Sequence, residues 1–139
     1  MVTRLLISLV AVFALTRAGA ALSVEPIQPP IKSATIYYAG WDTETPTAVS
    51  SAAEVRDMAE VVIEIRQARV AQALYAQLGV ERFSVPSHLV EPRLVIDFRF
   101  ANSPPLTFLA GDGMLWLENG RSGRPIDAAF KALFACGAW

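Results

Sequence analysis

The chain has 139 residues, of which 53% are hydrophobic, and its 12 basic and 13 acidic side chains give a net charge of −1. This length suits one domain, and the apolar fraction excludes an intrinsically disordered chain. A single cysteine and a single histidine exclude an internal disulfide framework and the common cysteine- or histidine-rich metal sites. We therefore expect no metal and no cofactor, and the acidic balance gives no attraction to nucleic acid.

Residues 1–20 have the pattern of a secretory signal peptide. Arg4 provides a positive start, an apolar run extends from Leu5 to Leu15, and Ala18 to Ala20 form a small-residue cleavage site. The apolar run is shorter than the roughly 20 residues of a membrane-spanning helix, although a retained membrane anchor is the alternative. Cleavage near Ala20 predicts a secreted or periplasmic protein of net charge −3 that no longer binds the membrane and that suits a basic partner slightly better than an acidic one.

The mature chain is expected to begin with an extended leader. Residues 21–32 contain three prolines, which remove backbone donors. A single domain is then predicted over 33–139. Its first strand is expected at Ser33–Ala39, which is rich in β-branched and aromatic residues, and a polar loop follows over Gly40–Val49.

The next segment predicts a short helix and then a strand. Ser51 and Glu54 have the spacing of a capping box, which indicates a helical turn over 52–58. Val61–Ile65 is almost entirely β-branched and is read as a strand.

The clearest helix is predicted over Arg66–Leu78. Its alanine, leucine, glutamine and arginine residues favour helix, and Gly79 is typical of a residue that ends one. The alternative joins 52–78 into one long helix with an apolar face.

The C-terminal half predicts strands with short connections. After a connection over 80–93, the strand Leu94–Phe100 alternates four apolar side chains on one face with Asp97 and Arg99 on the other. Leu106–Ala110 and Met114–Glu118 flank a glycine-rich turn and predict a hairpin.

A second turn is expected at Asn119-Gly120. A closing helix is expected to start at Pro125, and its apolar face would contain Ile126, Phe130, Leu133 and Phe134. The order of elements predicts an α+β fold: a small antiparallel sheet, made of a meander of about three C-terminal strands and one or two N-terminal strands, covered by two helices.

Candidate binding residues are aromatic or charged side chains expected at the surface. Tyr37 and Trp41 belong to residue types that favour binding interfaces. The polar face of a strand carries Asp97 and Arg99. A further pair, Arg121 and Arg124, precedes the predicted last helix and has the chemistry to hold a carboxylate or phosphate.

No catalytic motif accompanies the two residues that most often act as bases or nucleophiles. His88 lies in a connecting segment without a nucleophile elbow. Cys136 lies near a helix C-terminus, where the helix dipole disfavours a thiolate. No catalytic residue is therefore predicted.

The sequence favours a small exported binding module without enzymatic activity, for example an inhibitor, immunity or accessory protein. Its expected partner is a protein or another macromolecule of the cell envelope. One alternative is a small exported hydrolase that uses His88 with a carboxylate. Another is an envelope-structural domain that associates through an exposed edge such as strand 33–39.

Overall fold

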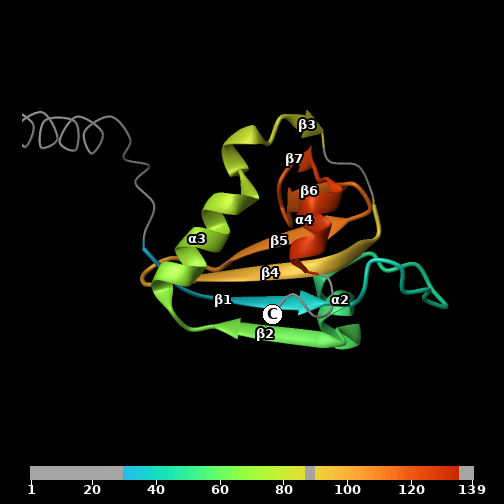
Figure 1. Cartoon of the computed structure of the whole chain (residues 1–139), viewed down its shortest axis with the longest axis horizontal. Coiled ribbons are helices and arrows are strands. Elements are labelled where there is room, and N and C mark those ends of the chain that lie inside the picture. Colours follow the sequence, from blue (N-terminus) through green and yellow to red (C-terminus); the bar gives the residue numbers. More distant parts are fainter. Residues whose placement is uncertain (1–29, 87–89, 135–139) are drawn as a thin grey trace, which may run out of the picture.

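Seven strands form one antiparallel sheet in the order β2-β1-β4-β5-β6-β7-β3 (Figure 1). The computed structural model describes residues 30–86 and 90–134. The predicted signal peptide and most of the leader, as well as His88 and Cys136, lie outside these residues. The strands are β1 (Ile31–Tyr38), β2 (Val61–Ile65), β3 (Val85–Pro86), β4 (Pro92–Phe100), β5 (Leu106–Gly111), β6 (Met114–Leu117) and β7 (Ser122–Pro125).

Short helices lie on both faces of this sheet. They are α2 (Ala52–Met58), α3 (Ala68–Leu78), the 3-10 turn η1 (Val80–Arg82) and α4 (Ala128–Leu133). Helices α3 and α4 pack on one face, and α2 packs on the opposite face. The described residues therefore form a single mixed α and β domain.

The predicted fold class, a small sheet covered by two helices, is wrong. The sheet is larger because it includes β3 and β7, which pair with each other, and because β7 also pairs with β6. Both strands are short and contain proline, and β7 also contains glycine, so neither has the β-branched pattern that marks a strand in a sequence. Its helices are also short, and they are divided between two faces rather than gathered on one.

Two further predictions, the start of the last helix and the position of the first strand at an edge of the sheet, are also wrong. Pro125 ends strand β7 and does not begin the last helix, which starts after Asp127, where the carboxylate accepts a hydrogen bond from the Phe130 N–H at 2.8 Å. Strand β1 lies between β2 and β4, so it is not the exposed edge expected for the envelope-structural alternative. The edge on that side is β2.

Local signals in the sequence placed the segment 52–78 well. Ser51 and Glu54 form the predicted capping box, in which each side chain accepts a hydrogen bond from the other residue's backbone N–H. Helix α3 ends at Gly79, which has a φ of 63°. Between the two helices, β2 is a strand, so the single long helix is excluded and the strand-then-helix interpretation is confirmed.

Strand β4 lies at the centre of the core, because it is buried on both faces. Phe98 is fully buried, and its ring makes edge-to-face contacts with Tyr75 of α3 and Phe108 of β5, at centroid distances of 5.2 and 5.7 Å. Arg99 is exposed on the other face, as the alternation predicts. This aromatic group attaches α3 to the middle of the sheet.

Replacing Phe98 with alanine should therefore destabilise the domain strongly. The expected loss in the free energy of unfolding is about 3–5 kcal/mol, out of a total of about 5–15 kcal/mol for a domain of this size. Arg99→Ala should cost less than about 1 kcal/mol. Urea titrations followed by circular dichroism would measure both, and equal losses at the two positions would contradict the orientation of β4.

Candidate functional site

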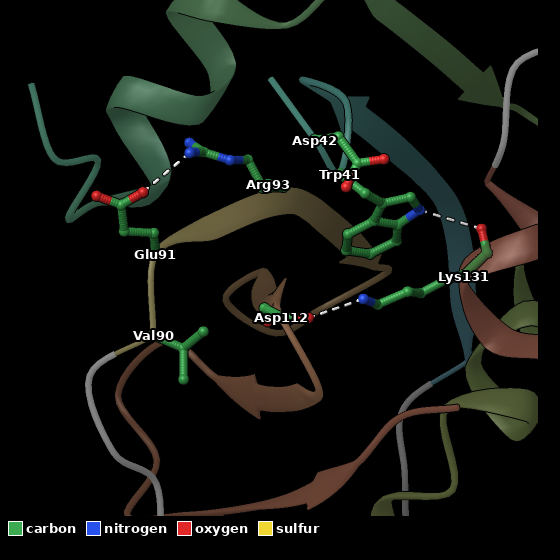
Figure 2. A pocket seen from close by; sticks show the side chains of 7 residues that line it. All are labelled: Trp41, Asp42, Val90, Glu91, Arg93, Asp112 and Lys131. Atoms are coloured by element: carbon green, nitrogen blue, oxygen red, sulfur yellow. Dashed lines mark hydrogen bonds and ion pairs between the residues drawn. The ribbon is translucent and has the colours of Figure 1, made fainter. Parts of the chain in front are cut away.

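A cavity of about 340 Å³ lies where the loop after β1, the start of β4, the β5–β6 turn and α4 meet. Seven side chains line it: Trp41, Asp42, Val90, Glu91, Arg93, Asp112 and Lys131. Figure 2 shows Val90, Glu91 and Arg93 on one side, Trp41, Asp42 and Lys131 on the other, and Asp112 between the two groups. Four segments that are distant in the sequence thus contribute to one concave site.

The chain turn after β1 presents Trp41 to this cavity. Gly40 has a φ of 87°, which favours glycine, and the next residue turns back toward the sheet. The Trp41 backbone N–H donates to the Tyr38 hydroxyl at 3.0 Å, and the indole N–H donates to the Lys131 carbonyl at 3.1 Å. Trp41 therefore joins the loop to α4 and forms an apolar wall with a defined orientation.

The β5–β6 turn and the start of β4 approach each other closely. At Gly111, a Cβ would lie 2.4 Å from the Glu91 carbonyl oxygen, so only glycine fits there. The pairing of β4 with β5 shifts register between Pro92 and Leu94. This bulge inserts Arg93 into the wall of the cavity.

Charged groups dominate the lining. Arg93 forms an ion pair with Glu91, and Lys131 forms one with Asp112, each at 2.9 Å. The Lys131 ammonium also lies 5.7 Å from the centre of the Trp41 ring. Within the described residues, the carboxylate of Asp42 takes part in no ion pair, so the cavity has three carboxylates and two cations, both of which are already neutralised.

Arg93 is the most buried charged residue of this group, with 9% of its surface exposed. One of its terminal nitrogens, Nη1, is buried and has no hydrogen-bond partner in the described part of the chain. An unpaired buried cation is costly, so the bond from Nη2 to Glu91 is what makes this burial tolerable. The pair holds one wall of the cavity in place.

Of the six predicted binding residues, the structure brings only Trp41 into the cavity. Asp97 lies on the sheet face beneath α2, where it accepts two hydrogen bonds from the Arg56 guanidinium, at 3.0 and 2.8 Å, and one from Thr107 at 2.6 Å. The hydrogen bond to Asp97 raises the pKa of Arg56. Tyr37 lies below the same guanidinium, 5.9 Å from its central carbon. These residues fasten α2 to the sheet.

The predicted arginine pair is separated by the fold. Arg124 is buried, and its guanidinium donates to the backbone carbonyls of Leu78, Gln77 and Pro125. It therefore caps the C-terminus of α3, and burial lowers its pKa. Arg121 is exposed and lies outside the cavity, so its role in binding stays a prediction.

None of the five charged residues of the cavity, which are Asp42, Glu91, Arg93, Asp112 and Lys131, was predicted as a binding residue from the sequence. Glu91 and Arg93 were assigned to a connection, because a bulge at the start of a strand has no pattern of its own. The turn that carries Asp112 was predicted correctly, but its partner Lys131 lies 19 residues further along the chain. The approach of Glu91 to Gly111 and the ion pair of Lys131 with Asp112 both join residues that are distant in the sequence, so neither has a local signal.

Comparison of the chain with protein-family models, curated proteins and solved structures found no match. Across residues 30–86 and 90–134, no helix has the length and apolar character needed to cross a bilayer. The same residues contain no group of three or more histidine, cysteine, aspartate or glutamate side chains placed to hold a metal ion.

The buried position of Arg124 predicts a structural role that Arg121 does not share. Arg124→Met should lower the free energy of unfolding by about 1.5–3 kcal/mol, because it leaves the last carbonyls of α3 without a donor. Arg121→Met should stay within about 0.5 kcal/mol of the wild type. Urea titrations would measure the free energy of unfolding of both variants. A loss for Arg121→Met as large as that for Arg124→Met would contradict the structural role of Arg124.

The ion pair with Lys131 lowers the pKa of Asp112 in the folded protein. A lowered pKa stabilises the fold above the unfolded pKa, and this contribution is lost as the pH falls through the folded pKa. Wild type should therefore be more stable than Asp112→Asn at neutral pH. The difference should begin to shrink as the pH falls below about 4, and it should vanish once Asp112 is protonated in the folded protein as well. Thermal unfolding across this range would measure it, and the difference should be absent in a Lys131→Met background at every pH.

Proposed function

We propose that this chain is an exported binding module without enzymatic activity, and that its cavity receives a basic side chain of a partner protein. The observation that carries the proposal is the unbalanced charge of the cavity. Its two cations are each paired with a carboxylate, whereas Asp42 has no ion-pair partner among the described residues and is left to pair with a charge from outside. Its export rests on the predicted signal peptide.

The shape and composition of the cavity suit a long cationic side chain. Trp41 offers an aromatic ring along which the methylene groups of lysine or arginine would pack. The carboxylates of Asp42, Glu91 and Asp112 would face the charged end. Because Trp41 is held by hydrogen bonds at both its backbone and its indole nitrogen, little side-chain entropy would be lost on binding.

The charge of the whole protein supports the same choice of partner. The mature chain would have a net charge of −3, so a basic surface would be attracted at long range. The hydrolase alternative depends on His88, which lies outside the described residues. The described part of the chain adds no support to it.

Isothermal titration calorimetry with a hexa-arginine peptide would test this proposal. A hexa-glutamate peptide is the control ligand of opposite charge. We expect binding of the basic peptide alone, weakened about tenfold or more by Asp42→Asn, since a charged contact is lost. Asp57→Asn is the matched control, because Asp57 is exposed on α2 and outside the cavity.

Equal weakening by the two substitutions would show that only the net charge matters, and would contradict a site at the cavity. Binding of hexa-glutamate in preference to hexa-arginine would overturn the proposed ligand class.

A further inference from the structure

The two edges of the sheet differ in how well they are protected. Strand β3 has two residues, and one of them is Pro86, which has no backbone N–H to offer. Strand β2 has five residues, pairs with β1 in a regular register, and contains neither proline nor lysine. Within residues 30–86 and 90–134, no strand pairs with its outer side, which lies along the lower margin of the molecule in Figure 1. Its unpaired backbone groups are thus open to another strand.

Apolar surface is concentrated beside this edge. The described residues include three large apolar side chains that are clearly exposed: Val62, Val70 and Leu133. Val62 belongs to β2 itself and is 53% exposed. The other two line an apolar groove of about 260 Å³ together with Ile65, which is also in β2. Val62 points to the opposite face of the sheet from Ile65, so apolar surface flanks β2 on both faces. Exposed apolar surface beside a strand edge marks an interaction surface.

We propose that β2 pairs in antiparallel orientation with β2 of a second copy of this chain, about a twofold axis at Ile63. The two sheets would then continue into one. Ile63 would lie opposite its own symmetry mate, and Val61 would lie opposite Ile65 of the second copy. All these side chains are β-branched, which favours cross-strand packing.

The charges at the two ends of β2 select this partner and this register. Glu60 precedes the strand and Arg66 follows it, and both are exposed. The antiparallel twofold arrangement places Glu60 of each copy opposite Arg66 of the other, so two ion pairs form. A parallel arrangement would place like charges together. A surface that complements itself in this way fits a second copy of the chain.

The existing ion pair of Arg66 with Glu64 does not prevent Arg66 from pairing with Glu60 of the second copy. Arg66 lies 2.7 Å from Glu64, but the two side chains are 86% and 58% exposed, and such pairs contribute little to stability. Arg66 is therefore able to turn toward Glu60 of the second copy. The cavity is not involved, because none of its lining residues belongs to β2 or to the apolar groove.

Sedimentation velocity from micromolar to millimolar concentration would test the proposal on four proteins: wild type, Glu60→Arg, Arg66→Glu and the double variant. We expect a wild-type dimer, dissociation constants raised about tenfold or more in each single variant, and recovery in the double variant, where the charges are exchanged. An equimolar mixture of the two single variants should also recover association as a heterodimer. Glu44→Arg, at an exposed loop residue, is the charge-matched control and should leave the dimer unchanged.

A monomer at every concentration would overturn the proposal. Dimers that are insensitive to both single variants would place the interface elsewhere. Association that neither the double variant nor the mixture restores would exclude the twofold register. All three positions are exposed, so circular dichroism is expected to show the same fold in every variant.

Discussion

Strand β4 imposes the constraint on which the rest of the structure depends, because it must be covered on both faces. Its side chains enter two separate apolar clusters, one beneath α3 and α4 and one beneath α2. Phe98 belongs to the first cluster and Val95 to the second. A strand with two buried faces requires helices on both sides of the sheet, which explains why the short helix α2 is retained opposite the other two.

Arginine side chains connect these layers. Arg56 joins α2 to the sheet through a two-point contact with Asp97, and Arg124 joins the end of α3 to β7. Arg124 also lies 5.3 Å from the Phe130 ring, so it contacts α4 as well. The planar guanidinium presents five donors in a rigid geometry, which suits it to hold several acceptors at once. In a chain with one cysteine, which cannot form an internal disulfide, such contacts supplement the core.

The sequence was informative wherever the cause of a structure is local. The capping box at Ser51, the end of α3 at Gly79 and the alternation around Phe98 depend on neighbours within a few residues, and all three were predicted correctly. The pairing of β3 with β7 joins residues almost forty positions apart, and neither strand has a pattern of its own. The size of the sheet could not be predicted for this reason.

The candidate site was largely hidden for a related reason. Trp41 stands out by its residue type, but its neighbours in the cavity are ordinary charged residues whose role depends on distant contacts. Arg93 is buried because the chain bulges opposite Gly111, and Lys131 reaches the cavity because α4 folds back onto the loop after β1.

The two proposed surfaces, the cavity and the β2 edge, depend on different interactions. The cavity depends on charged groups whose attraction is screened by salt. The β2 edge adds backbone hydrogen bonds and apolar side chains, which salt affects little, to the two ion pairs of Glu60 with Arg66, which salt also screens. Because the two surfaces share no residue, a dimer formed through β2 would present two cavities and hold a partner with two basic sites more tightly than either cavity alone, provided that the spacing of those sites allowed both to engage.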